Sequence, residues 1–424
     1  MRTGTTISTE VPSATLGSPI ACTLYLPPGY QHGHDQHGPD QHGPDRYPVL
    51  YLLHGRGDSM NSFDRAVTML DGLIGDGRVP PVIAVAPDAP WSGRAGWYVD
   101  SAYTGDIGDG DRGHGPGKPM ETALVRDLVP AVDAAYRTIA TREGRVVGGY
   151  SMGGAGALRL ALAHQRLFAH ALVLSPAVYV PLPPADSNTR AFGAYGSGER
   201  VFDEDTYRRL SYPALLPSVD PTLPLHLFIA VGRGDYESGD HAQGDHAQAE
   251  HAQVEHPQRP SRHDIGSEHE ALYEAVRRIP GIRARARVLP GGHDWSTWLP
   301  ALAEGLEFLG PLLRAAAHPA GTPGSAATQP ASPAVTESVA TAPAATAPAA
   351  TEPAATEPAA TERAAAEWAA TASNATAGTA AAPTVAAPNA AARTAAAPTA
   401  AASTVAAPIE ASIPGTSAPP KDNQ

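Results

Sequence analysis

Two kinds of apolar pattern alternate along residues 1–310 of this 424-residue chain. The first kind is a short run rich in apolar, often β-branched residues. Such runs are typical of strands buried on both faces of a sheet. They lie at residues 47–55, 81–88, 144–150, 169–176, 225–232 and 284–292.

The second kind of pattern has helical spacing and falls between several of these runs. It covers residues 120–139, 153–165, 268–279 and 298–313. Buried strands that alternate with helices predict an α/β fold with a mostly parallel sheet and helices on both faces. The patterned part of the chain has about 270 residues, which suits one large domain better than two small ones. In such sheets, catalytic and ligand-binding residues lie in loops at the carboxyl ends of the strands.

From about Ala315 the chain becomes rich in alanine, proline and threonine. Threonine recurs every five residues from Thr341 to Thr361, with prolines between. This composition buries too little apolar surface to offset the entropy of ordering, and the prolines interrupt helices. We therefore expect one domain over residues 1–314 and a disordered tail, or a semi-extended spacer, over residues 315–424. A tether to a partner or to the cell envelope is an alternative for this tail.

Histidine-rich repeats occur at residues 31–45 and 240–258, and together they hold eight of the 17 histidines. A five-residue spacing turns successive rings to different sides of a helix or a strand, so the rings do not converge on one ion. We interpret both repeats as solvated loops inserted in the domain. Weak adventitious metal binding is the alternative, and no specific metal site is predicted.

The composition narrows the classes of partner and location. The formal net charge of −13 argues against nucleic acid or an anionic membrane as partner. A single cysteine, Cys22, allows no internal disulfide and fits a reducing compartment. The first residues lack the apolar core of a signal peptide, and no run has the length of a membrane span. The expectation is a cytoplasmic protein with no membrane span.

The segment Gly149-Tyr150-Ser151-Met152-Gly153 lies between a predicted strand and a predicted helix. This is the context of the G-x-S-x-G nucleophile elbow, a strained turn that exposes a serine at the head of a helix. Side chains at the two glycine positions would collide where strand and helix pass close together. The amide end of the helix favours the negative charge that develops there. A serine in an ordinary tight turn is the competing interpretation.

A serine hydroxyl needs a base to take its proton, and the base needs an acid to hold its tautomer. In this context the chain order is serine, acid, histidine. Asp235 follows the strand at 225–232, and His293 follows the strand at 284–292. We therefore predict Ser151 as nucleophile, Asp235 as acid and His293 as base.

Other residues compete for these roles. Glu237, Asp240 and Asp294 are rival acids, and each ranks below Asp235. His226 lies inside a predicted strand and suits a packed core position. His54 stands before the glycine turn of "HGRGD", where we expect it to shape the turn.

Two backbone amides should stabilise the oxyanion of the tetrahedral intermediate. We predict the N–H groups of Met152, directly after the nucleophile, and of Arg56 in the "HGRGD" loop. A glycine turn without a catalytic part is the alternative for that loop. Several aromatic residues are expected in loops on the same side of the sheet as the triad. They either line a pocket for an acyl or aryl group or anchor their loops. These are Trp91, Trp97, Tyr98, Phe192 and Tyr195.

Five stretches carry a family resemblance: "YPVLYLLHGRGDSMNSF", "VIAVAPDAPWSGRAGWYVDS", "ETALVRDLVPAVDAAYRT", "GGYSMGGAGALRLAL" and "LPGGHDWSTW". They resemble the esterase D-like family of α/β-hydrolases over roughly residues 20–312. That family includes feruloyl and acetyl esterases, S-formylglutathione hydrolase, enterochelin esterase-like proteins and mycolyltransferases. The resemblance implies the same roles for Ser151, Asp235 and His293. The histidine repeats depart from the family pattern, and the second begins five residues after Asp235.

These observations favour a serine carboxylester hydrolase that works through an acyl-enzyme on a small-molecule ester, with no metal or organic cofactor. An acyltransferase of the mycolyltransferase type would use the same triad. A protein of a different class, a non-enzymatic binding or tethering protein, is the remaining alternative. The order serine, acid, histidine argues against it.

Overall fold

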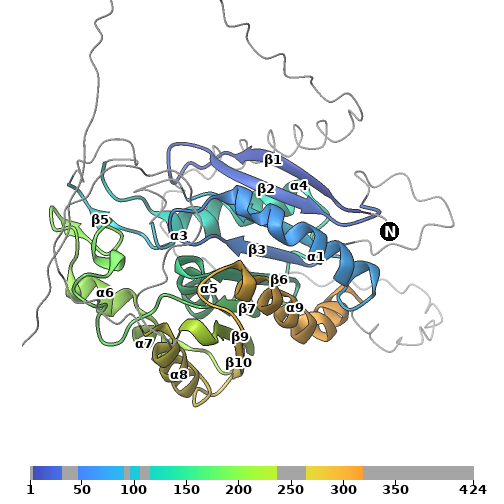
Figure 1. Cartoon of the computed structure of the whole chain (residues 1–424). Helices are drawn as coiled ribbons and strands as arrows, with labels where there is room; N and C mark the ends of the chain where they lie inside the picture. The colour runs from blue at the N-terminus through green and yellow to red at the C-terminus, as the bar shows by residue number, and fades with distance from the viewer. Residues whose placement is uncertain (1–2, 31–45, 90–95, 106–114, 236–263, 319–424) are drawn as a thin grey trace, which may run out of the picture. The chain divides into compact units, whose positions relative to one another are not determined.

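The computed structural model describes residues 3–30, 46–89, 96–105, 115–235 and 264–318 (Figure 1). Both histidine-rich repeats and the tail from residue 319 lie outside these residues, so their predicted loop and disorder character stays a prediction. An eight-stranded sheet runs in the order β1-β2-β4-β3-β6-β7-β9-β10. Its strands are β1 Thr5–Val11, β2 Ile20–Leu26, β3 Val49–Leu53, β4 Ile83–Pro87, β6 Arg145–Tyr150, β7 His170–Leu174, β9 Leu225–Gly232 and β10 Ile282–Leu289.

All six strands that the sequence predicts are present, as β3, β4, β6, β7, β9 and β10. They are parallel to one another, as predicted. All but the edge strand β10 are buried apolar runs, and β10 alternates arginine with less exposed residues. The hairpin β1–β2, which the apolar runs did not predict, extends the sheet antiparallel to β4. Strand β1 is largely exposed and polar, so it lacks the buried apolar run used to find the others.

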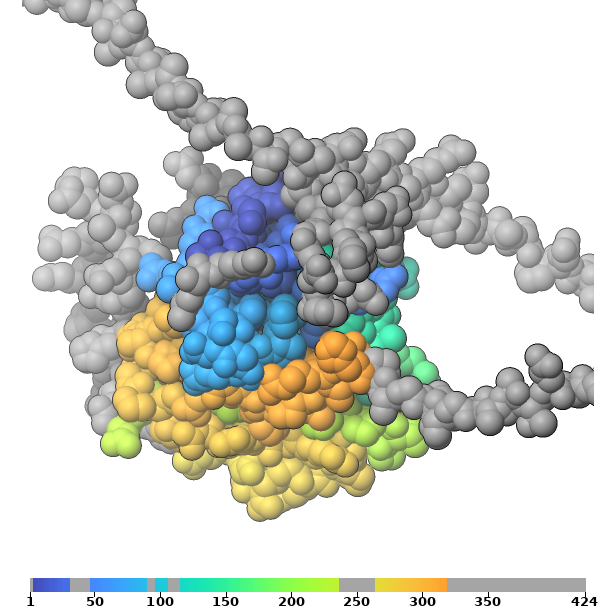
Figure 2. All heavy atoms as spheres, turned by 90° about the vertical axis from the view of Figure 1, so that its right-hand side faces the viewer, coloured from blue at the N-terminus to red at the C-terminus, as the bar shows by residue number. Residues whose placement is uncertain are grey.

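Helices cover both faces of this sheet, as predicted (Figure 1). Helices α1 and α9 share one apolar core with the sheet, while α3, α4, α5 and α8 share the other. Figure 2 shows the α1 region and α9, blue and orange, side by side on one face; an ion pair between Arg78 and Glu307 also joins them. The helices are α1 Asp64–Gly75, α3 Met120–Ala123, α4 Val129–Ala135, α5 Met152–Ala163, α6 Glu204–Leu210, α7 Tyr212–Leu215, α8 Ile265–Val276 and α9 Trp295–Ala317.

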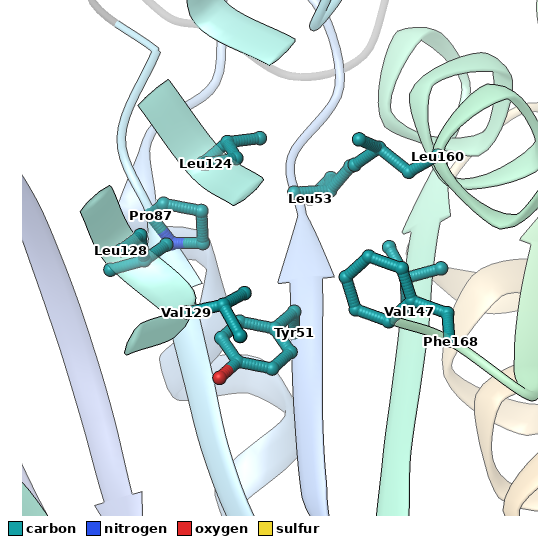
Figure 3. Close-up of a pocket in the computed structure, with 9 residues that line it drawn as sticks. All are labelled: Tyr51, Leu53, Pro87, Leu124, Leu128, Val129, Val147, Leu160 and Phe168. Atoms are coloured by element: carbon teal, nitrogen blue, oxygen red, sulfur yellow. The ribbon is translucent and has the colours of Figure 1, made fainter. Parts of the chain in front are cut away.

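The helix expected over residues 120–139 is interrupted. A π-helical turn at Leu124–Leu128 separates α3 from α4. Pro130, at the start of α4, has no amide hydrogen for the carbonyl four residues before it, which favours such a break. A small apolar cavity lies between this segment and the sheet, lined by β3 and β6 residues such as Leu53 and Val147 (Figure 3).

Two short helices stand between β7 and β9, and α7 packs against α5. A short parallel pair, β5 Ala102–Tyr103 and β8 Ser197–Gly198, ties this region to the loops after β4. In the described part of the chain, no helix combines the length and apolar character needed to cross a membrane. The carboxyl ends of β6, β9 and β10 lie at one edge of the sheet, because these strands are parallel.

Candidate active site

Ser151 occupies the turn between β6 and α5 with a φ of 55° and a ψ of −119°. A residue with a side chain rarely adopts a positive φ, so this backbone is strained and held by its surroundings. Its amide donates to the carbonyl of Leu174 over 2.9 Å, and its carbonyl accepts from the amide of Ala177 over 3.1 Å. These bonds to the end of β7 fix the turn. The serine is therefore presented at the head of α5.

Gly149 and Gly153 flank this turn because a side chain fits at neither position. A Cβ at Gly149 would overlap the carbonyl of Gly153, and a Cβ at Gly153 would overlap the carbonyl of Leu53 at the end of β3. At these two positions, strand β6, helix α5 and strand β3 thus approach backbone to backbone. This is the collision that the spacing of the two glycines predicts.

Ser151, His293 and Asp235 form one hydrogen-bonded chain. The Nε2 atom of His293 lies 2.9 Å from the Oγ atom of Ser151, and its Nδ1 atom lies 2.8 Å from Oδ1 of Asp235. Because a carboxylate only accepts, Nδ1 is the protonated nitrogen and Nε2 is left to accept from the serine hydroxyl. The Asp235 side chain is 1% exposed and that of His293 is 25% exposed. The chain therefore runs from a buried acid to an accessible hydroxyl.

The carboxylate of Asp235 has two further donors. Its Oδ2 atom accepts from the hydroxyl of Ser175 at 2.7 Å and from the amide of Gly232 at 2.8 Å. Burial by itself would raise the pKa of Asp235, but the hydrogen bond and charge of His293, followed by the bonds from Ser175 and Gly232, lower that pKa below its usual value. Asp235 is thus an anion that holds the imidazole in one orientation.

The competing residues that the structure describes make other contacts. The Oδ1 atom of Asp294 accepts from the amide of Ser296 at 2.7 Å and so caps α9. Glu237 and Asp240 lie outside the described residues. His54 is 2% exposed; its Nδ1 lies 2.8 Å from the carbonyl of Gly55, and its Nε2 accepts from the amide of Ala89. His54 therefore shapes the turn after β3, as expected.

The loop at residues 54–58 lies directly beside the nucleophile. A Cβ placed on Gly55 would be 3.5 Å from the Cβ of Ser151. Arg56 follows Gly55 in this loop, and Met152 is the first residue of α5. The guanidinium of Arg56 lies 5.9 Å from the centre of the Phe192 ring, which belongs to the segment between β7 and β9.

The predicted pocket aromatics that the structure describes differ in their surroundings. The rings of Trp97 and Tyr195 lie 6.1 Å apart and line a cavity beside α5 that also involves Ala155. Tyr98 is fully buried and donates to the carbonyl of His54 over 3.1 Å, which is the position of a loop anchor. Trp91 lies outside the described residues.

Sequence reasoning missed three residues that contact this site: Ser175, Tyr150 and Trp298. Ser175 follows β7, a buried strand. Its position at the carboxyl end of that strand indicates a site residue only when the order of strands in the sheet is known. Trp298 packs edge-to-face on His293, with ring centres 5.2 Å apart. Within the described ranges, no three His, Cys, Asp or Glu side chains are grouped so as to hold a metal ion.

Comparison with known proteins places this geometry in a family. A family model described as "Putative esterase" matches residues 13–309, most of the chain. The chain belongs to this esterase family. Its fold is the α/β-hydrolase fold that the sheet and the elbow predicted.

Individual relatives cover only part of this esterase. This chain is 37% identical to the esterase Rv1288 of Mycobacterium tuberculosis over 129 residues. The match covers 30% of this chain and 24% of that protein. An endo-1,4-beta-xylanase/feruloyl esterase of Xylanibacter ruminicola is 29% identical over 191 positions, or 44% of this chain and 24% of that protein. The matched regions thus span about a quarter of these relatives. A solved ferulic acid esterase shares the fold, with a TM-score of 0.53 at 22% identity over 74% of this chain and 100% of its own.

Proposed function

We propose that this esterase hydrolyses small carboxylic esters through an acyl-enzyme formed on Ser151. The observation that carries the proposal is the continuous hydrogen-bonded chain from Ser151 through His293 to Asp235. Each of the three groups follows a different parallel strand. The sheet therefore fixes their positions relative to one another. The Oγ atom of Ser151 is the nucleophile in this mechanism.

Acylation begins when Oγ of Ser151 attacks the ester carbonyl and Nε2 of His293 takes the hydroxyl proton. The imidazolium that forms is stabilised by the Asp235 carboxylate, which remains ionised. His293 then returns the proton to the leaving alcohol, and the acyl group stays on Ser151. Water repeats the attack with His293 as base, which releases the acid and restores the serine.

The tetrahedral intermediate in both halves of the reaction carries an oxyanion. We propose that the backbone amides of Met152 and Arg56 donate to it. Met152 begins α5, whose amino end favours negative charge, and the 54–58 loop lies beside Ser151. Removal of one such donor typically costs about 10²–10³-fold in kcat.

The substrate class is an ester of a small acid, and aryl acids are the first to test. The named relatives include a feruloyl esterase, and Trp97 and Tyr195 line a cavity beside α5. A panel of p-nitrophenyl esters of increasing chain length, with feruloyl esters and thioesters beside them, ranks the acyl groups by kcat/KM. An acyltransferase would use the same three residues. Adding an alcohol to the assay tests this alternative, because an acyltransferase would then form a new ester in place of the free acid.

Labelling with a fluorophosphonate probe tests the nucleophile directly. The parent should be labelled on the peptide that contains Ser151, and Ser151→Ala should lose both label and turnover, by about 10⁶-fold in kcat. Ser218→Ala, at an exposed serine in the same chain, is the matched control and should label like the parent. A labelled, active Ser151→Ala protein free of contaminating esterase would overturn the proposal.

A further inference from the structure

Tyr150, the residue directly before Ser151, makes contacts that the mechanism above does not use. Its side chain is 2% exposed. Its hydroxyl donates to Oδ2 of Asp58 over 2.6 Å and lies 2.8 Å from the hydroxyl of Ser62. Burial first, and then the charge of Asp58, raise the pKa of Tyr150 well above its usual value. The phenol is therefore a proton donor at every working pH.

The acceptor Asp58 closes the loop beside the nucleophile. Its amide donates to the carbonyl of Gly55 at 3.2 Å, which forms the turn of the 54–58 loop. Its Oδ1 atom accepts from the amide of Ser59 at 3.1 Å, while Oδ2 accepts from Tyr150. Gly57, in the middle of the loop, is exposed and has a φ of 77°. The phenol of Tyr150 thus ties an otherwise exposed turn to the end of β6.

The ring of Tyr150 also packs against the 54–58 loop. A Cβ on Gly55 would come within 2.9 Å of Cε2 of Tyr150, so the backbone at Gly55 rests on the ring edge. That backbone leads directly into Arg56, whose amide is one of the two proposed oxyanion donors. The position of this amide relative to Ser151 is therefore set by the residue that precedes Ser151.

The ring of Tyr150 also contacts an aromatic side chain of α9. Trp298 of α9 stacks on Tyr150 with ring centres 4.4 Å apart and planes 27° apart. The same Trp298 packs edge-to-face on His293. Tyr150 thus contacts both the 54–58 loop and the indole that packs on the histidine.

We propose that Tyr150 is a positioning residue of this esterase: through Asp58 it holds the 54–58 loop so that the Arg56 amide meets the oxyanion. This inference rests on the proposed function. Oxyanion donors act only when they are oriented before the charge develops, and the contacts of Tyr150 are those that orient this loop. The bond matters in the transition state and not in the bound substrate, so its loss should lower kcat and leave KM nearly unchanged.

The chain offers a matched control for the removal of this phenol. Tyr25 is also fully buried, and its hydroxyl donates to a carboxylate, Oδ1 of Asp71, over 2.7 Å. That pair joins β2 to α1 and has no contact with the 54–58 loop among the described hydrogen bonds. Tyr25→Phe and Tyr150→Phe therefore each delete a hydrogen bond from a buried tyrosine to an aspartate, once away from the site and once beside it.

The test compares Tyr150→Phe, Tyr25→Phe and the parent on one p-nitrophenyl ester at one pH. We expect both variants to lose Tm by similar amounts. Only Tyr150→Phe should lose kcat, by about 10- to 100-fold, with KM within about threefold of the parent. Affinity for a transition-state analogue should fall by the same factor as kcat/KM. Equal kcat for the two variants, or a loss confined to KM, would overturn the inference.

Variants of Asp58 check the route through that carboxylate. Asp58→Ala removes the acceptor and should reproduce the kcat loss of Tyr150→Phe, whereas Asp58→Asn keeps an acceptor oxygen and should lose less. The double variant Tyr150→Phe/Asp58→Ala should be no slower than either single variant, because both remove one bond. Additive losses would contradict the route. A parent that neither labels nor turns over overturns the proposed function, whereas an active parent with an unaffected Tyr150→Phe overturns only this inference.

Discussion

Ser175 donates a hydrogen bond of 2.7 Å to Oδ2 of Asp235, the carboxylate oxygen that does not contact His293. Ser175 is fully buried and has a φ of 38°. It follows β7, whereas Asp235 follows β9, its neighbour in the sheet. The orientation of the acid therefore depends on a strained residue from the adjacent strand.

Ser175→Ala should lower kcat by roughly 10-fold, because hydrogen bonds to charged groups contribute about 1.5–3 kcal/mol and part of that orients Asp235. KM should change little. Ser13→Ala is a matched control, since the Ser13 hydroxyl donates to Oδ2 of Asp127 over 2.5 Å away from the triad. Both variants are assayed for kcat, KM and Tm. If Ser13→Ala loses as much kcat as Ser175→Ala, Ser175 has only a structural effect.

The position of the triad could be predicted because each member carries a local signal. The glycines around Ser151 mark the elbow, and the loops of Asp235 and His293 each follow an apolar run. Parallel strands bring such loops to one edge of the sheet. The chain order serine, acid, histidine then favoured His293 among the histidines. No knowledge of which strands are neighbours was needed.

The supporting contacts could not be predicted because they depend on neighbours in the sheet. Ser175 reaches Asp235 only because β7 and β9 pair, although α6 and α7 separate them in sequence. Tyr150 reaches Asp58 because β6 pairs with β3. Strand β1 was not predicted for a different reason, since it is polar and largely exposed. Strand β2 is buried and mostly apolar, and its pattern was overlooked.

Gly153→Ala should destabilise the fold severely, because the added methyl group would overlap the backbone carbonyl of Leu53, which cannot move without shifting β3. Gly72→Ala is the matched control. Gly72 lies inside α1, and nothing stands within 4 Å of its Cβ position. That variant should gain about 0.5–1 kcal/mol from helix propensity. Urea unfolding measures both, and a Gly153→Ala protein as stable as the parent would show that the elbow tolerates a side chain.

The free energy of unfolding should fall as pH drops from 6.5 to 4. Burial lowers the pKa of His269 from 6.5 to about 4, and burial with the neighbouring His226 does the same for His170. Between these values the unfolded chain binds a proton that the folded chain does not, so stability rises with pH across this window. Each group contributes about 1.4 kcal/mol per pH unit at most. His269→Leu should therefore show a shallower slope of unfolding free energy between pH 4 and 6.5. An unchanged slope would mean that His269 is protonated in the fold.

A chain that ends after His318 should keep the Tm and kcat/KM of the full protein. Helix α9 continues to Ala317, slightly beyond the predicted boundary at residue 314. Leu313 is fully buried, and Arg314 donates to the carbonyls of Gly77 and Arg78 over 3.3 Å. A cut after Glu307 removes these contacts and should cost several kcal/mol. If the cut after His318 unfolds the protein, residues 319–424 contribute to the folded core and the tail prediction is wrong.

The assignment of the acid is tested by comparing a substitution with a deletion. Asp235→Asn should cost roughly 10⁴-fold in kcat, because an amide favours the wrong imidazole tautomer. Deletion of residues 240–258 should leave kcat within a few-fold of the parent. That deletion keeps residues 236–239 and 259–263 to join Asp235 to α8, whose start is capped by Asp264. A shorter connection changes the loop-closure entropy by only about 0.6 kcal/mol per halving of its length. Both variants are assayed on one ester at one pH, with Tm measured beside kcat. If the deletion is damaging and Asp235→Asn is mild, a residue within the repeat supplies the acid, and the 2.8 Å contact between Asp235 and His293 has no catalytic role.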